Sequence, residues 1–587
     1  MAKVNVIIEL THSKKLENNA TAGMESEGPV NLELAASQRL SMVDYDETFP
    51  AVMLPSISEV EFPEDESFDS NAAVAFDALP DHSTYIVRGQ VEEADIPKLE
   101  KEAEKNNAVV NVYADVGIEP MLICPGSPPM GTDADVERLL CTTTMRSRGM
   151  DGSGVLVAIV DTGVNMAFLN SKGKTPTFDA ARSWSWNPAV VTPGNAPVGH
   201  GTMCAFDVCI AAPKCTLLDV VLLRPLSTPP GGSLMSGLLS DAIRAYRHLL
   251  NVMLAPRRPG ELRSLVVNNS WGMFHPSWDF PVGHSGNYSD NPNHPFNVIV
   301  ATLERAGADI LFAAGNCGAD CPDGRCQGVT TRAIYGANSS PYVTCVAGVD
   351  ISKKRVGYSA IGPGRLAVRK PDISGYTHFK GSGVYAADGG TSAACPVVAG
   401  VVAAVRSRKP HNPGDSSTSA SAIRSLITST AEDLGAVGYD FLHGHGVING
   451  CGLARKFPFI SICRRFPWIC RPPIVDICRI RPWLCRGEVP PIIDFCRRYP
   501  NLCRQLPVPP IPPIPPIPPR PPINELGLEM GYEQPEEEYF DEFDFEGFEG
   551  GESTDAEIAF LLGKLASRQE SSANAEKRSG DCGCGNK

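Results

Sequence analysis

Residues 154–163 read GVLVAIVDTG, and this stretch decides the fold expected for the chain. Its six residues after the first glycine are all apolar, which is typical of a strand buried on both faces of a sheet. Similar runs, SLVVNN at 264–269 and DILFAA at 309–314, alternate with stretches of helical periodicity such as 236–254. The alternation predicts an α/β domain with a parallel sheet that is covered by helices on both faces.

Three residues that can act together in nucleophilic catalysis stand at the borders of such elements. Asp161 ends the first strand, His200 lies between glycines in GHGTMCA (199–205), and Ser392 lies among small side chains in GGTSAACP (389–396). A serine hydroxyl needs a base to accept its proton, and that base needs an anion to hold its tautomer. Taken singly, each residue has a plainer explanation: a turn aspartate, a structural histidine and a helix N-cap serine.

Taken together and in this order, the three motifs resemble those of the subtilisin-like serine proteases, the subtilases. NNSWG (268–272) is similar to the substrate-binding strand of that family, AAGN (313–316) to its oxyanion segment, and GHGVING (444–450) to its closing turn. The resemblance covers about residues 135–456. It implies a subtilisin-like α/β domain that hydrolyses peptide bonds through an acyl-enzyme.

The resemblance also assigns a role to each site residue. It implies that Ser392 attacks the substrate, that His200 acts as general base and then acid, and that Asp161 orients His200. Asn316 and the backbone N–H of Ser392 would stabilise the oxyanion. The substrate backbone would pair, as an added strand, with Ser270, Trp271 and Gly272.

Two positions beside the serine depart from the family pattern. Ala393 follows Ser392 where the family usually has methionine, and Cys395 precedes Pro396 in place of a small hydroxyl residue or alanine. Neither change removes a catalytic atom, so we expect a working site. The alternative is a catalytically silent scaffold that holds a peptide in its cleft without cutting it.

Composition divides the rest of the chain into distinct segments. Residues 84–123 have a strand, helix, strand pattern, and its position resembles that of the subtilase propeptide, which assists folding and blocks the cleft until it is cut. A plain accessory domain is the alternative; a propeptide would be cut off between residues 120 and 150. The expected order is an acidic, partly ordered N-terminal region (1–75), a small α+β propeptide-like module (76–125), the catalytic domain (135–456), three Cys-containing repeats (457–504), a proline-rich linker (505–523) and an acidic, disordered tail with a short amphipathic helix (524–587).

The formal net charge of −15 is carried mainly by the two ends of the chain. Residues 1–120 sum to about −16 and residues 525–557 to about −14, whereas residues 455–504 sum to about +8. No large basic face is evident, which argues against nucleic acid as a partner. No run of about 20 apolar residues and no secretory signal pattern is visible, so we expect no membrane span, and the compartment is either the cytoplasm or one reached by another export route.

Cys317, Cys321 and Cys326 in CGADCPDGRC suggest either a zinc site or a disulfide. Three thiols leave tetrahedral zinc one ligand short, so a disulfide between Cys321 and Cys326 across the Pro-Asp-Gly turn is the favoured interpretation. The other thiols of the catalytic region fit as small core residues: Cys204, Cys209, Cys215, Cys345 and Cys395.

The sequence therefore predicts a serine endopeptidase that is made as a proenzyme. Its partners would be a polypeptide substrate and its own propeptide-like segment. No cofactor is chemically required and no metal ligand is assigned, although family members often use calcium for stability. The cysteine-rich repeats and acidic tail also suggest a dedicated processing protease for ribosomally made peptides, which would differ in substrate more than in chemistry.

Overall fold

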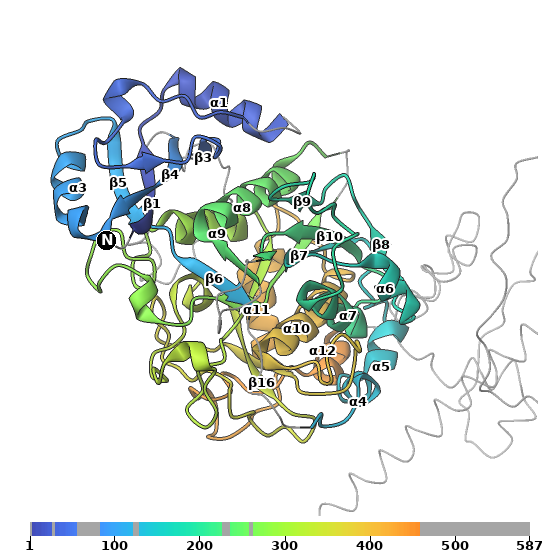
Figure 1. Cartoon of the computed structure of the whole chain (residues 1–587). Helices are drawn as coiled ribbons and strands as arrows, with labels where there is room; N and C mark the ends of the chain where they lie inside the picture. The colour runs from blue at the N-terminus through green and yellow to red at the C-terminus, as the bar shows by residue number, and fades with distance from the viewer. Residues whose placement is uncertain are drawn as a thin grey trace, which may run out of the picture. The chain divides into compact units, whose positions relative to one another are not determined.

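The structure, a computed structural model, describes residues 3–25, 30–55, 83–120, 128–225, 235–257 and 262–457 (Figure 1). The predicted Cys-containing repeats, proline-rich linker and acidic tail lie outside the described residues. All described residues belong to the first of two compact units, Met1–Phe459. Within the described part of the chain, no helix is both long and apolar enough to cross a membrane.

The largest sheet among the described residues has eight strands, and its neighbouring strands pair in parallel. Its order is β17-β16-β15-β13-β7-β10-β8, with β9 also paired to β10. Every residue of β7, β13, β15, β16 and β17 is buried, which explains the unbroken apolar runs in the sequence. The strands are β7 (Val155–Asp161), β8 (Thr177–Phe178), β9 (Trp184–Ser185), β10 (Thr216–Val221), β13 (Ser264–Asn269), β15 (Asp309–Ala313), β16 (Thr344–Val349) and β17 (Ile373–Tyr376).

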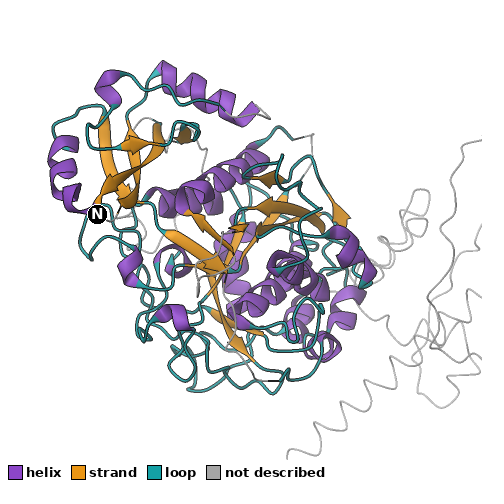
Figure 2. Ribbon diagram, in the orientation of Figure 1, coloured by secondary structure: helices purple, strands orange, loops and turns teal. Residues whose placement is uncertain are grey.

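Helices lie on both faces of this sheet (Figure 2). α7 packs against α10 on one face, and α8 packs against α9 on the other. α10 approaches α7 so closely that a Cβ atom on Gly400 would lie 2.3 Å from the backbone oxygen of Val208. The predicted α/β class is therefore confirmed. The helices of this domain are α4 (Asp133–Leu139), α5 (Thr142–Ser147), α6 (Met166–Ser171), α7 (His200–Ala211), α8 (Leu239–Leu254), α9 (Pro295–Arg305), α10 (Gly390–Arg406), α11 (Ala420–Ser429) and α12 (Gly450–Lys456).

An antiparallel sheet forms the N-terminal module, which we define as residues 3–25, 30–55 and 83–116. Its order is β2-β4-β1-β5, with β3 also paired to β4. β1 pairs with both β4 and β5, so the predicted boundary at residue 75 does not separate two regions. Local pattern cannot show this, because the paired strands lie about 80 residues apart in the chain. The elements are β1 (Lys3–Leu10), α1 (Lys14–Glu25), β2 (Asp44–Tyr45), β3 (Val52–Leu54), β4 (Thr84–Glu92), α3 (Ile96–Ala103) and β5 (Val109–Ala114).

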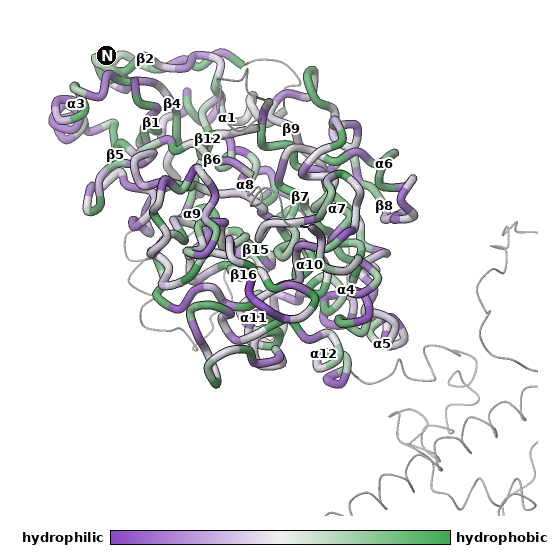
Figure 3. The backbone as a smooth tube through the Cα atoms, turned by 60° about the horizontal axis from the view of Figure 1, so that its bottom comes forward, coloured by the Kyte–Doolittle hydropathy of each residue, from purple (hydrophilic) through white to green (hydrophobic). Residues whose placement is uncertain are grey.

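A small antiparallel sheet connects the module with the larger domain. Its order is β11-β12-β6-β14, so β6 (Gly117–Pro120), which directly follows the module, lies between β12 (Met235–Leu238) and β14 (Trp271–Gly272). β11 (Arg224–Pro225) completes it. One continuous cluster of buried apolar side chains extends through the module and the larger domain, and Figure 3 marks their hydrophobic segments in green.

Candidate active site

Asp161 is the last residue of β7 and lies at the carboxyl edge of the large sheet, fully buried. Its Oδ1 accepts a hydrogen bond from the backbone N–H of Thr162 at 2.7 Å. Its backbone oxygen accepts hydrogen bonds from the N–H groups of Leu222 and Leu223, which follow β10. The strand and its neighbour therefore fix this carboxylate in one orientation.

His200 is the first residue of α7 and is 4% exposed. The glycine after it allows the helix to begin against the turn that follows β7. A Cβ atom on Gly201 would lie 2.6 Å from the backbone oxygen of Gly163, and the N–H of Gly201 donates to Oγ1 of Thr162 at 2.9 Å. This close approach places Nδ1 of His200 2.8 Å from Oδ1 of Asp161.

The hydrogen bond with Asp161 determines which ring nitrogen of His200 carries the proton. A carboxylate beside Nδ1 favours the tautomer that is protonated there, which leaves Nε2 as the basic nitrogen. Nε2 is buried and has no hydrogen-bond partner among the described residues. An imidazole held in this state is suited to accept a proton from a neighbouring hydroxyl.

Ser392 is the third residue of α10 and is fully buried. Its Oγ donates to the backbone oxygen of Ser270 at 3.2 Å, and Oγ of Ser270 donates to the backbone oxygen of Ser392 at 3.0 Å. Sγ of Cys204 lies 3.8 Å from Oδ2 of Asp161, 3.9 Å from Nδ1 of His200 and 3.7 Å from the backbone oxygen of Ser392. One thiol therefore contacts all three residues, so β7, α7 and α10 bring them to the same place.

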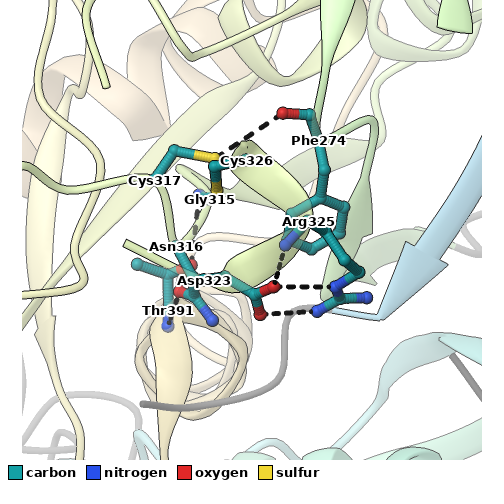
Figure 4. Close-up of a disulfide and its surroundings, with 8 residues drawn as sticks. All are labelled: Phe274, Gly315, Asn316, Cys317, Asp323, Arg325, Cys326 and Thr391. Carbon is teal, nitrogen blue, oxygen red and sulfur yellow. Dashed lines mark hydrogen bonds and ion pairs between the residues drawn. A yellow bond between two sulfur atoms is a disulfide. The ribbon is translucent and has the colours of Figure 1, made fainter. Parts of the chain in front are cut away.

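Asn316 follows β15 and is fully buried beside the start of α10. Its Oδ1 accepts hydrogen bonds from both the backbone N–H and the Oγ1 hydroxyl of Thr391, each at 3.0 Å (Figure 4). Oγ1 of Thr391 in turn accepts from the N–H of Gly315 at 3.1 Å. Since Oδ1 is the acceptor in this network, Nδ2 is the donor end of the side chain.

The loop after Asn316 contains a disulfide between Cys317 and Cys326 (Figure 4). The favoured prediction of a Cys321–Cys326 bond was therefore wrong. Cys321 is itself disulfide-bonded, so none of the three cysteines is a thiolate available to zinc. The spacing of three nearby cysteines cannot decide their pairing, because the outcome depends on how the loop folds back. A further disulfide joins Cys141 and Cys451, next to α5 and within α12.

The other cysteines of the domain agree with their prediction as core residues. All five are free and buried: Cys204, Cys209, Cys215, Cys345 and Cys395. Cys204 has a second property that the sequence did not reveal, namely its contact with the site residues. Burial, and next the charge of Asp161, raise the pKa of the Cys204 thiol well above its usual range, so this thiol is protonated.

Ser270 directly follows β13, and Trp271 and Gly272 form β14. Nε1 of Trp271 donates to the backbone oxygen of Val160 at 2.9 Å, which ties β14 to β7. Trp271 pairs with Pro120 and Gly272 with Glu119 in the antiparallel register of β6. Of the three predicted substrate-binding residues, Ser270 contacts Ser392, and β6 pairs with the other two.

Only one group of three potential metal ligands occurs among the described residues, and it consists of Asp161, His200 and Cys204. Their ligand atoms lie within 4.8 Å of one another. A metal ion there would need Nδ1 of His200, which is already bonded to Asp161, and it would need a thiolate where burial favours the thiol. The geometry fits a hydrogen-bonded pair better than a resident metal centre.

Several buried carboxyl groups surround the site. Burial, together with the charge of Asp161, raises the pKa of Asp219 to about 7 against the opposing effect of the hydrogen bonds from the N–H groups of Gly194 and Val164. Asp207, on α7, and Asp388, four residues before Ser392, lie close enough for the charge of Asp388 to act on Asp207. Burial raises the pKa of both, and that of Asp388 reaches about 6.

Comparison with known proteins decides the family. The model of the Subtilase family matches residues 152–446, half of the chain. The chain belongs to the subtilase family. A thermostable alkaline protease of Halalkalibacterium halodurans is 25% identical over 390 residues, which are 66% of this chain and 86% of that protein. Subtilisin DY of Bacillus licheniformis is 27% identical over 318 residues (53% and 94%), and subtilisin BL of Lederbergia lenta is 28% identical over 311 residues (52% and 91%).

These relatives confirm the predicted class of protein: this subtilase is a subtilisin-like serine-type endopeptidase. Sequence reasoning missed the residues through which the N-terminal module contacts the subtilase domain. Asp115 accepts hydrogen bonds at the start of α8, from the N–H and Oγ of Ser240 at 2.9 and 2.7 Å. Glu119 forms an ion pair with Arg325. No local signal in the sequence marks such partners, because the residues of each pair lie more than 100 positions apart.

Proposed function

We propose that Asp161, His200 and Ser392 are the catalytic triad of this endopeptidase. The observation that carries the proposal is the buried hydrogen-bonded pair of Asp161 and His200. Nε2 of His200 has no hydrogen-bond partner among the described residues, and both His200 and Ser392 contact the thiol of Cys204. Oγ of Ser392 attacks the carbonyl carbon of the scissile peptide and Nε2 of His200 accepts its proton. Asp161 holds the ring in position and stabilises the imidazolium that forms.

The charge that develops on the carbonyl oxygen needs donors that are already in place. Nδ2 of Asn316 and the backbone N–H of Ser392, at the start of α10, supply them. Thr391 holds Oδ1 of Asn316 through two hydrogen bonds, so the side chain needs no reorganisation when the oxyanion forms. His200 then protonates the leaving amine, and water hydrolyses the acyl-enzyme by the reverse sequence of proton transfers.

We further propose that the N-terminal module, together with β6, is a propeptide. β6 lies between β12 and β14 as an added strand, which is the place that an extended substrate would take. Ile118 of β6 is fully buried and lies next to Gly237 of β12. The segment resembles a bound substrate in both its backbone pairing and its side-chain burial.

Contacts of the module itself support this proposal. The N–H of Ala114 donates to the backbone oxygen of Gly286 at 2.9 Å, and Nε2 of His294, the N-cap residue of α9, lies 3.0 Å from the backbone oxygen of Ala114. With the Asp115 contact at the start of α8, the module is anchored to the N-termini of both helices. The side chain of Asp115 also lies at the N-terminus of α8, where the helix dipole favours a negative charge.

The register of β6 supports a proposal for the position of the maturation cut. β6 and β14 run antiparallel, so the carboxyl end of β6, at Pro120, faces the end of β14 that adjoins Ser270, whose backbone oxygen accepts a hydrogen bond from the Ser392 hydroxyl. We therefore place the cut within two residues after Pro120. A plain accessory domain would not be cut there.

The experiment compares three proteins after expression and purification: the wild type, Ser392→Ala, and Ser421→Ala, which changes an exposed serine on α11. Intact mass and N-terminal sequencing give the processing state. We expect the wild type and Ser421→Ala to begin within two residues after Pro120 and Ser392→Ala to stay uncut. An active wild type that keeps its full N-terminus would overturn the propeptide proposal, and processing of Ser392→Ala by itself would overturn the role of Ser392.

A further inference from the structure

Arg325 forms an ion pair with Glu119 of β6, the strand that we propose to occupy the place of a substrate. Nη1 of Arg325 donates to Oε2 of Glu119 at 2.8 Å, and each side chain is only 15% exposed. Charge-assisted hydrogen bonds of this kind are stronger than neutral ones, and partial burial protects them from screening by salt.

Arg325 is held rigidly on the domain side of this contact. Its Nε and Nη2 donate to the two carboxylate oxygens of Asp323 at 3.0 and 2.8 Å. Its guanidinium lies 3.6 Å from the centre of the Phe274 ring (Figure 4). These contacts orient the guanidinium so that its remaining nitrogen, Nη1, points to Glu119.

The loop that carries Arg325 is braced against the oxyanion segment. The Cys317–Cys326 disulfide closes it, and the N–H of Asp323 donates to the backbone oxygen of Asn316 at 2.9 Å. The position of Arg325 is therefore set relative to Asn316 before any substrate enters. A preformed donor of this kind discriminates between ligands better than a mobile surface arginine.

Glu119 also has a defined place along the added strand, because it pairs with Gly272. Its neighbour Ile118 points to the opposite face of the strand, as alternation requires, and is fully buried. The side chain of Glu119 thus contacts the loop of Arg325, and the side chain of Ile118, on the other face of the strand, is buried.

We propose that Arg325 is a specificity-determining residue, which selects substrates with an acidic side chain at the position that pairs with Gly272, directly after an aliphatic residue. This inference rests on the proposed function, since it assumes that β6 binds in the same place and register as a substrate. After maturation, a substrate carboxylate takes the place of the Glu119 carboxylate beside Nη1 of Arg325, while Asp323 and Phe274 keep the guanidinium in place.

The test uses quenched fluorescent peptides built on the chain's own sequence, GIEPMLI (117–123), and on versions with Gln or Lys in place of Glu. Gln has nearly the same shape as Glu but lacks the charge. With the self-processed wild type we expect kcat/KM to be about tenfold higher for the Glu peptide than for the Gln peptide. The preference should shrink when the salt concentration is raised.

Two variants and a matched control assign the preference to Arg325. In Arg325→Gln the Glu and Gln peptides should be cut at similar rates. Arg325→Glu should prefer the Lys peptide. Arg138→Gln, which changes an exposed arginine on α4, should keep the wild-type preference.

The outcomes separate this inference from the proposed function. If the wild type cuts none of the peptides and shows no other serine-dependent activity, the proposed function fails. If it cuts the Glu and Gln peptides equally well, Arg325 serves only to dock the module and the inference is overturned. The wild-type ratio decides this by itself, so the test remains valid even if a variant at position 325 does not fold.

Discussion

Nδ1 of His200 lies 2.8 Å from Oδ1 of Asp161, and the two side chains are 4% and 0% exposed. Water therefore has little access to this hydrogen bond, and the carboxylate acts on the ring in a medium of low dielectric constant. The pair fixes both the orientation and the tautomer of the imidazole.

Asp161→Asn should retain the fold but lower kcat by about 10⁴-fold, the loss known for the corresponding change in another serine protease family. The amide can donate a hydrogen bond to Nδ1, which would place the ring proton on Nε2, where Ser392 needs an acceptor. Steady-state kinetics with a peptide substrate measures the loss. A variant with near wild-type kcat would show that Asp161 does not set the tautomer.

Asn316→Ala should lower kcat by about 10²–10³-fold, the loss known for the oxyanion-hole asparagine of subtilisin itself. KM should change little, because Nδ2 acts mainly on the charge that develops in the transition state. A loss confined to KM would argue for a binding role instead. Thermal unfolding checks the fold, since the variant also loses the hydrogen bonds from Thr391.

Replacement of both Cys317 and Cys326 by alanine should lower the free energy of unfolding by about 2–3 kcal/mol, as expected for a disulfide that closes a short loop. The selectivity for an acidic residue should also decrease, because the loop that positions Arg325 becomes less rigid. Denaturant titration in the Ser392→Ala background measures stability without self-digestion. An unchanged unfolding midpoint would contradict a stabilising role of this bond.

Asp219 should make stability depend on pH. Its pKa is about 7 in the folded protein and about 3.8 in its ordinary state, so between these values the folded state binds more protons than the unfolded one. The contribution of this group to stability is then complete below pH 4 and is lost as the pH rises toward 7.

The matching variant is Asp219→Asn in the Ser392→Ala background. Its amide oxygen can still accept from Val164 and Gly194, but it does not titrate. Relative to the parent protein, its unfolding temperature should therefore improve steadily from pH 4.5 to pH 7. A difference that stays constant over this range would contradict the raised pKa.

Much of the main domain could be predicted from sequence because its signals are local. A strand such as β7 is buried on both faces, and a parallel sheet collects the carboxyl ends of such strands at one edge, which is where Asp161 lies. Gly201, after His200, allows close approach of two backbones, and Gly390, before Ser392, has a positive φ, so the sequence itself marks both positions with glycine.

Other features depend on contacts between distant segments, and local patterns do not contain them. β1 belongs to the sheet of β4 and β5, although an acidic stretch without a regular pattern separates them in the sequence. Cys317 pairs with Cys326 because of how the loop folds after Asn316. The partner of Arg325 lies 206 positions away, so neither its charge nor its spacing indicates the contact.

The measurement that tests the central claim most directly is covalent labelling by a fluorophosphonate, followed by peptide mapping. We predict that the processed wild type takes up one phosphonyl group, on the peptide that contains Ser392, and that labelling fails in Ser392→Ala and is greatly slowed in His200→Ala. A label on another serine, or equal labelling of the wild type and Ser392→Ala, would contradict the assignment of Ser392 as the nucleophile.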